Sequence, residues 1–311
     1  MGPPEASLRS PAVAQPEAPQ RARLYAVAAC LGVGLWGCAY PGAPEGYRPT
    51  LGQPGKDVIW LPTSDELLMK MLRAARVGPN DWVYDLGAGD GRIAIAAAKD
   101  FGARAVGIEY DARMAEHAQR NVERAGVASR VQIIQGDIFK EDFSKATVIT
   151  LYLLEELNFR LRPTLLRMPA GTRVVSNTFS MGDWEPDEVL SAAGQTGYFW
   201  VVPATVHGNW NIRIVTHDTG ISQTRQGHLK LTQRYQRVGG TLDLDGQPQP
   251  LLGVQLRGSF LEFRFIDHRG LLQAARVQVQ AEQFQGPLDP PYGMLEIPIS
   301  PGHIEGWRAR Y

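Results

Sequence analysis

The sequence contains very little cysteine. Cys30 and Cys38 are the two cysteines in 311 residues, and everything after Cys38 carries none. A disulfide framework, a thiolate zinc site and a catalytic thiol are therefore excluded from the main body of the chain. The six histidines are scattered and form no i,i+3 or i,i+4 pair. We expect no metal site.

An excess of charge of either sign is also absent. Lys and Arg total 32, as do Asp and Glu, so the formal net charge is zero. A general nucleic-acid binder normally has a basic excess, so general nucleic-acid binding is not expected. The composition, 44% hydrophobic and 21% charged, is that of a globular protein. The length favours two domains, or one domain with an addition.

The N-terminal region is unlike the remainder of the chain. Residues 1–23 are rich in Pro, Ala and Gln and are predicted to be a disordered lead, which a misassigned start codon would explain. Residues 24–40 carry no charge and follow two arginines. They are short for a spanning helix, which needs about 20 residues. This pattern fits a signal peptide or membrane anchor, with a buried helix of the fold as the alternative. Residues 41–57 are predicted to be a linker, because they are rich in Gly and Pro.

Cys38 ends a short stretch, Leu35-Trp36-Gly37-Cys38, that is similar to a bacterial lipoprotein processing site. The Trp departs from that pattern, which usually has a small or branched residue before the Gly. The stretch predicts a membrane-associated or exported protein. Cys38 is the candidate for lipidation. If the segment does not work as a signal, the protein is expected to be cytoplasmic.

Residues 58–217 show alternating strand and helix patterns. Short apolar runs at 81–86, 105–109, 131–137, 146–151 and 172–177 predict strands, and amphipathic stretches between them predict helices. Strands that alternate with helices at this spacing indicate an α/β domain with a Rossmann-like, doubly wound, mostly parallel sheet.

A glycine-rich loop follows the first of these strands. Gly87, Gly89 and Gly91 allow a sharp turn and close approach of a ligand to the backbone, and the next helix presents free N–H groups. Glu109 follows the second strand, at the position from which a carboxylate binds the ribose hydroxyls of an adenosine cofactor. Asp85 lies in the first strand, and Asp137 follows the third.

These residues carry a resemblance to a known family. DLGAGDGR, GIEYD and QGDIF are similar to motifs I, II and III of the class I (seven-strand) S-adenosylmethionine (SAM)-dependent methyltransferases. The glycine pattern differs from the G-x-G-x-x-G of dinucleotide enzymes, which disfavours a nicotinamide oxidoreductase. PTSDELLMKML and GTRVVSNTFSMGDWEPD extend the resemblance to a bacterial and mitochondrial protein-lysine methyltransferase-like subgroup, over about residues 58–217.

The resemblance implies a role for each matching residue, with SAM as the cofactor. The methionine end of SAM would be lined by Asp85, Gly87, Ala88 and Gly89, and Glu109 would hold the ribose. Asp137 would bind the adenine amino group, with Ile138 against the ring, and Thr63 would touch the SAM carboxylate. Read without the resemblance, Glu109 is a solvated acid at a strand end and Asp137 is a turn residue.

The substrate end of the domain is less informative. The fourth strand ends in TLYLLEE, without the Asn/Asp-Pro-Pro-aromatic motif of enzymes that methylate nucleic-acid amino groups. Tyr152 and Glu155 follow this strand, where the substrate channel should open, and could orient an amine. The alternative is a packed aromatic side chain and a helix-capping acid.

Residues 218–311 alternate apolar and polar side chains with period 2, broken by Gly239-Gly240, Asp245-Gly246 and Arg269-Gly270. This predicts an all-β C-terminal domain, a small antiparallel barrel or sandwich. Members of the bacterial subgroup are similar in carrying such a tail.

The resulting hypothesis is a methyltransferase that acts on an amine, with a protein lysine as the substrate that the resemblance implies. One alternative is a small-molecule or lipid methyltransferase near a membrane. Another is an exported, non-catalytic module that binds a nucleoside-like ligand or a protein, because SAM is cytosolic whereas residues 24–40 look like an export signal. The sequence predicts no particular oligomeric state.

Overall fold

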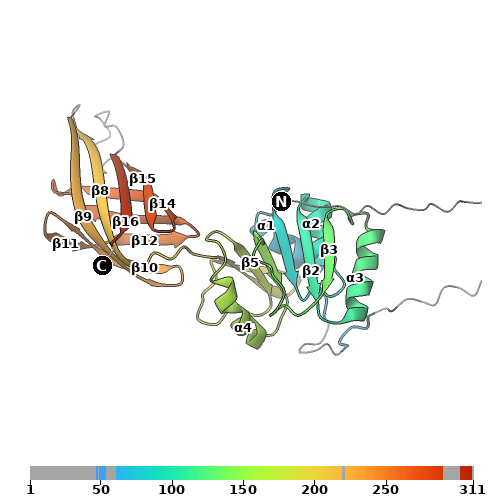
Figure 1. The fold of residues 1–311 in the computed structure, drawn as a ribbon. Coiled ribbons are helices and arrows are strands. Elements are labelled where there is room, and N and C mark those ends of the chain that lie inside the picture. The colour runs from blue at the N-terminus through green and yellow to red at the C-terminus, as the bar shows by residue number, and fades with distance from the viewer. Residues whose placement is uncertain (1–46, 48, 54–60, 219–220, 290–301, 310–311) are drawn as a thin grey trace, which may run out of the picture. The chain divides into compact units, whose positions relative to one another are not determined.

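The computed structural model describes residues 47, 49–53, 61–218, 221–289 and 302–309. The predictions for residues 1–23 and 24–40, including Cys38, lie outside these ranges. Within them, no helix combines the length and the apolar character that crossing a membrane requires. The described chain contains two β-sheets, the first of them accompanied by helices (Figure 1).

The first sheet has seven strands in the order β3-β2-β1-β4-β5-β7-β6. β1 to β5 are parallel, and β7 runs antiparallel between β5 and β6. This confirms the Rossmann-like, mostly parallel sheet, although the sequence pattern had not indicated its last two strands. The strands are β1 (Trp82–Leu86), β2 (Arg104–Glu109), β3 (Val131–Gln135), β4 (Val148–Leu151), β5 (Arg173–Asn177), β6 (Glu188–Ala192) and β7 (Gln195–Val201).

Four helices accompany this sheet: α1 (Asp65–Ala74), α2 (Arg92–Phe101), α3 (Ala112–Arg124) and α4 (Glu155–Leu165). α1 begins after Ser64, whose hydroxyl accepts a hydrogen bond from Leu67 N, and Asp111 caps α3 in the same way through Met114 N. α2 instead begins at Gly91, which has no capping side chain, and ends at Gly102 in the left-handed conformation.

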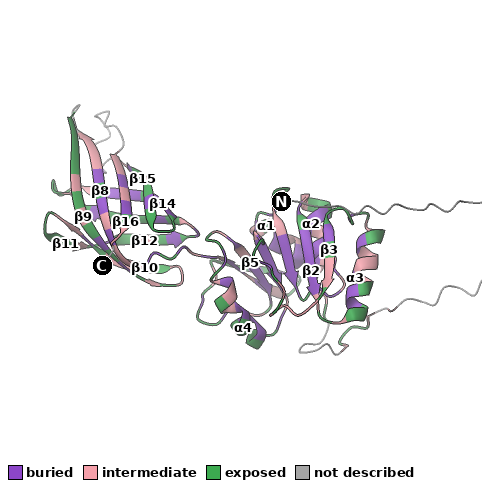
Figure 2. Cartoon of the chain, in the orientation of Figure 1, coloured by how far each residue is buried: buried purple, intermediate pink, exposed green. Residues whose placement is uncertain are grey.

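The strand residues divide between two apolar layers, because successive side chains point to opposite faces of a sheet. Val83, Val148 and Val175 pack with α1 and α2, whereas Tyr84 and Ile149 pack with α4. Both faces are therefore covered, and the central strands are buried over nearly their whole length (Figure 2). Asp85, Thr150 and Asn177 share the face of α1 and stand at the carboxyl ends of their strands.

The second sheet has nine antiparallel strands in the order β11-β10-β9-β8-β16-β15-β14-β13-β12. Contacts of β10 with β12 and of β11 with β13 bring its two edges together, which confirms the expected barrel. The strands are β8 (Gly208–Asp218), β9 (Ile221–Arg234), β10 (Arg237–Leu244), β11 (Gln247–Pro250), β12 (Leu252–Arg257), β13 (Phe260–Ile266), β14 (Leu272–Gln280), β15 (Gln283–Asp289) and β16 (Gly302–Arg308).

The expected domain boundary between residues 217 and 218 falls at the end of β8. β8 pairs along its length with β9 and also with β16, so its hydrogen bonds are made in the second sheet. The strand pairing places the junction before Gly208. The sequence pattern missed this because β8 is preceded by a stretch without a clear turn signal.

Candidate functional site

The loop between β1 and α2 turns within a few residues. Gly87, Gly89 and Gly91 all have positive φ angles, which side chains disfavour. A Cβ atom at Gly87 would stand 2.9 Å from Leu153 Cδ2, so a side chain there would require Leu153 to shift. The N–H groups of Gly87 and Ala88 both donate to Ile108 O, at 2.9 and 3.0 Å. These two hydrogen bonds hold the loop against the end of β2.

Glu109 ends β2 and is hydrogen-bonded to this loop. Its Oε2 accepts from Gly89 N at 2.9 Å, and its Oε1 accepts from Asp111 N at 3.0 Å. Burial raises the pKa of the Glu109 carboxyl, and the backbone donors of Asp111 and Gly89 oppose that shift. The carboxylate is therefore fixed in orientation, with further acceptor lone pairs on both oxygens.

Asp85 is 2% exposed and lies directly beneath the glycine loop. Its Oδ1 accepts a 2.7 Å hydrogen bond from Thr150 Oγ1, on the neighbouring strand β4. Burial raises the pKa of Asp85 to about 7; the Thr150 hydrogen bond opposes the shift, and the charges of Asp90 and Glu109 add to it. Such a carboxylate would be stabilised by a cation bound next to it.

Thr63 lies in the segment before α1 and is 3% exposed. Its hydroxyl accepts from Asn177 Nδ2 at 3.1 Å, and its carbonyl accepts from Arg92 Nη1 at 3.1 Å. Arg92 also pairs with Asp90, at 2.8 Å. The pre-helix segment is in this way connected to the carboxyl end of β5 and to the glycine loop.

Asp137 follows β3, and its Oδ1 accepts from Phe139 N at 3.1 Å. Asp137 therefore stabilises the turn after β3, as its position suggests. Gly136 N donates a 2.9 Å hydrogen bond to Glu109 O, which connects this turn to the end of β2. Ile138 is partly buried against the α4-side core. Both residues lie at the strand-end edge that carries Glu109.

Tyr152 and Glu155 follow β4 at the same edge. Tyr152 is half-buried, whereas Glu155 is exposed at the start of α4 and accepts a 3.3 Å hydrogen bond from Ser180 Oγ. This hydrogen bond connects Glu155 to the loop after β5. That Tyr152 and Glu155 orient the acceptor amine stays a prediction.

Arg92, Thr150 and Asn177 were missed by sequence reasoning. Thr150 and Asn177 are polar residues at the ends of otherwise apolar strands, and both are fully buried. Such a position requires a hydrogen-bond partner, and that requirement is the signal that could have identified them. Arg92 carried no comparable signal, since an arginine at the start of a helix is an ordinary surface residue.

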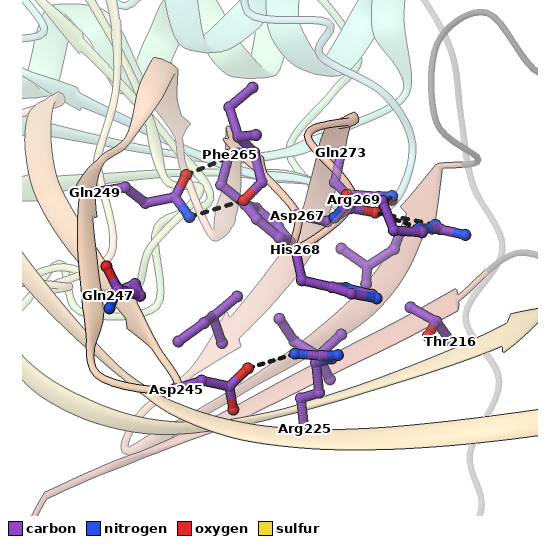
Figure 3. A pocket seen from close by; sticks show the side chains of 14 residues that line it. Thr216, Arg225, Asp245, Gln247, Gln249, Phe265, Asp267, His268, Arg269 and Gln273 are labelled. Atoms are coloured by element: carbon purple, nitrogen blue, oxygen red, sulfur yellow. Dashed lines mark hydrogen bonds and ion pairs between the residues drawn. The ribbon is translucent and has the colours of Figure 1, made fainter.

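The barrel contains a separate cavity of about 340 Å³ at one end (Figure 3). Its acids are paired within the wall, Asp245 with Arg225 and Asp267 with Arg269. None of the residues expected to bind SAM lines this cavity. The predicted cofactor residues all belong to the α/β domain.

Comparisons with known proteins agree with this geometry. The model of the ANTKMT methyltransferase domain family matches residues 85–188, from the strand that carries Asp85 to the start of β6. A protein-lysine N-methyltransferase of Saccharolobus islandicus is 42% identical over 151 residues, which cover 47% of this chain and 94% of the relative. This chain belongs to the class I SAM-dependent methyltransferases, in the protein-lysine methyltransferase subgroup.

Two further proteins similar to this methyltransferase are named for different acceptors. The adenine nucleotide translocase lysine N-methyltransferase of Mus musculus is 30% identical over 128 residues, and the match spans 41% of this chain but only 54% of the relative. A crystal structure from Salinibacter ruber, described as an RNA methyltransferase with S-adenosyl-L-homocysteine, is 47% identical, with a TM-score of 0.46, and covers 47% of this chain and 96% of that one.

The cofactor of this methyltransferase is SAM, and the described residues fit it. The positive φ angles of Gly87, Gly89 and Gly91 give the sharp turn that a loop wrapped around the cofactor requires. Glu109 offers an oriented carboxylate where the resemblance implies the ribose would lie, and the buried Asp85 suits a neighbouring positive charge. The individual contacts assigned to these residues are expectations that ligand-binding measurements should examine.

Proposed function

We propose that this enzyme transfers the methyl group of SAM to the ε-amino group of a lysine in a protein. The observation that carries the proposal is the 42% identity to a protein-lysine N-methyltransferase across 94% of that relative. The mouse relative, named as an adenine nucleotide translocase lysine N-methyltransferase, supports the same acceptor class. Only part of its length matches, so its particular substrate is not carried over.

When bound, SAM supplies a methyl group on a positively charged sulfur. The residues of the chain bind SAM and orient it. Glu109 would accept hydrogen bonds from the ribose hydroxyls, while Gly89 N and Asp111 N hold its carboxylate in place. Asp85, whose pKa burial raises to about 7, would in its ionised form stabilise the cationic methionine end. Methyl transfer itself requires alignment more than acid–base chemistry at the cofactor.

The acceptor amine must lose a proton before its lone pair can attack. We assign Tyr152 and Glu155 to the entrance through which the amine arrives, because both follow β4 at the edge that holds Asp85. Glu155 is exposed and so can attract a protonated lysine, and its hydrogen bond from Ser180 holds it toward the loop after β5. Tyr152 would orient the amine through its hydroxyl.

The proposal is tested with the purified full chain and SAM carrying a labelled methyl group. The acceptors are a soluble protein extract, a membrane protein extract and total RNA, each from the same cells. We expect label in protein, recovered as methyl-lysine by mass spectrometry, and far less label with the Glu109→Ala variant at the same SAM concentration. Label confined to RNA or to small molecules would refute lysine as the acceptor.

We also propose that residues 24–40 attach the protein to a membrane, either as an uncleaved anchor or through lipidation at Cys38. The support is the basic pair followed by an uncharged segment. Fractionation of cells expressing the wild type and Cys38→Ser distinguishes the two. Release of the variant would indicate lipidation, retention would indicate an anchor, and a soluble wild type would contradict both.

A further inference from the structure

The outer face of the barrel carries a row of amides next to an exposed tryptophan. The strands β14, β15 and β16 are neighbours in the sheet (Figure 1). Residues on this face are exposed, and their neighbours along each strand are buried. Trp307 is 39% exposed, and Phe260, three strands away on β13, is 60% exposed. A hollow of about 290 Å³ lies beside Trp307, lined by four glutamines, Gln278, Gln280, Gln283 and Gln285, together with Glu305 and Trp307.

The strand register arranges these side chains in two rows. Phe260 pairs with Gln278, Gln278 with Gln285, and Gln285 with Glu305. In the adjacent row, Gln280 pairs with Gln283 and Gln283 with Trp307. Directly paired residues on one face have Cβ atoms about 5 Å apart, so the four amides form one continuous group.

The charged residues of this face are compensated within it. Glu305 forms an ion pair with Arg213, and Arg276 pairs with both Glu262 and Asp289. A charge-compensated face does not favour a nucleic acid or an anionic membrane, both of which require basic excess. The face also has too few apolar side chains for the core of a stable protein interface.

The four amides are available for a ligand. All four glutamine side chains and Trp307 are exposed, so their polar groups can reach a ligand in solution. Each amide offers two donors and one acceptor oxygen, which matches hydroxyl groups that both donate and accept. The face of an indole ring is negative, so it attracts the polarised C–H groups on one side of a sugar ring.

We propose that this face, the amide patch of Gln278, Gln280, Gln283, Gln285 and Trp307, binds an uncharged polysaccharide chain. The two aromatic side chains are separated by three strand spacings, about 14 Å across the strands, and stand in adjacent rows. A chain of several sugar units can contact both aromatics and the amides between them, whereas a single sugar can contact only one. The ligand is therefore an extended chain and not a free monosaccharide.

The full-length protein is titrated calorimetrically with cellotetraose and with chitotetraose, and with glucose and N-acetylglucosamine as single-unit probes. We expect at least one tetrasaccharide to bind, and the single sugars to bind far more weakly. Trp307→Ala should lower the affinity about tenfold or more, because it removes the stacking surface. Gln280→Ala and Gln283→Ala should each lower it about two- to tenfold, the range for one hydrogen bond.

Gln226→Ala is the matched control. Gln226 is an exposed amide on the same sheet, but it lies on β9 beyond Arg213 and outside the patch. It should bind the tetrasaccharide as the wild type does, and all variants should keep the wild-type melting temperature and SAM affinity. The proposal is overturned if neither tetrasaccharide binds, if the single sugars bind equally well, or if Trp307→Ala has no effect. It is also overturned if Trp307→Ala instead dissociates a dimer in sedimentation, since the face would then be an interface between copies.

Discussion

The two sheets distribute their polar residues in opposite ways. In the parallel sheet, β1 and β4 are buried nearly throughout, because helices cover both faces. In the barrel, β13 alternates strictly between exposed and buried residues, since one face meets the core and the other meets water. A strand covered on both faces needs apolar side chains on both, whereas a strand covered on one face needs them only at every second residue.

Buried polar residues show the same contrast. Among the described residues, seven of them belong to the α/β domain and only Gln273 belongs to the barrel. The seven are Thr63, Asp85, Thr150, Asn158, Thr172, Ser176 and Asn177. Burying a polar group costs free energy unless it is hydrogen-bonded. Among the seven, Asp85 is hydrogen-bonded to Thr150 and Thr63 to Asn177, next to the candidate cofactor site. The barrel places its polar chemistry on the surface instead.

Removing a barrel core side chain gives the largest expected effect. Phe263 is 1% exposed, and Phe263→Ala should lower the free energy of unfolding of the barrel by about 3–5 kcal/mol. If the two domains carry separate roles, SAM affinity at 20 °C should remain at the wild-type value while the barrel stays folded. Calorimetric unfolding and SAM titration measure the two quantities.

Phe260→Ala on the same strand is the control, because Phe260 points outward and should change stability by less than about 0.5 kcal/mol. A loss of SAM affinity in a folded Phe263→Ala protein would break the comparison, since the barrel would then support the cofactor site.

The second effect concerns Asp85. Its pKa rises from 3.8 in the unfolded chain to about 7 in the folded protein, so the folded state binds the extra proton between these values. Stability from Asp85 is therefore fully present below pH 4 and is lost as the pH rises through 7, by up to about 4 kcal/mol. Asp85→Asn should remove this dependence and make the protein more stable than wild type at pH 8.

Urea unfolding of both proteins at pH 5, 6, 7 and 8 measures this difference, and taking the difference cancels the other titrating groups. SAM should stabilise the wild type more at pH 8 than at pH 5, because the ionised Asp85 favours its positive charge. Equal slopes for wild type and variant would show that Asp85 is ionised throughout.

The third effect is the loss of the Glu109 carboxylate. Glu109→Ala removes the proposed ribose acceptor and leaves Gly89 N and Asp111 N without their partner. We expect SAM affinity to fall about 100-fold, or about 2.7 kcal/mol. Glu109→Gln retains one acceptor oxygen, so its SAM affinity should lie between those of the wild type and Glu109→Ala. Calorimetric titration measures all three proteins, and unchanged affinity in Glu109→Ala would remove Glu109 from the site.

The fold was largely predictable because its periodicities are strong. The five parallel strands and four helices coincide with apolar runs and caps, such as Ser64 before α1. β6 and β7 were missed because their exposed and buried residues mix without clear alternation. The boundary before Gly208 was missed because no clear turn signal precedes β8.

Much of the candidate site was predictable from motif spacing, since the glycine loop, Glu109 and Asp137 each follow a strand. Thr150 and Asn177 were not, because their partners, Asp85 and Thr63, are distant in the sequence. Hydrogen bonds between residues so far apart along the chain depend on strand order, which no local pattern encodes.

The smallest expected effect comes from one of these missed residues. Thr150→Val keeps the shape of the side chain but removes the hydroxyl that donates to Asp85 at 2.7 Å. Because this hydrogen bond favours the ionised carboxylate, its loss should raise the pKa of Asp85 above 7, by about one unit or less. At pH 7 SAM affinity should fall about two- to tenfold, with recovery at pH 9. Thr172→Val, a buried threonine on another part of the domain, is the control. An affinity loss that persists unchanged at pH 9 would mean that Thr150 acts through packing and not through the charge of Asp85.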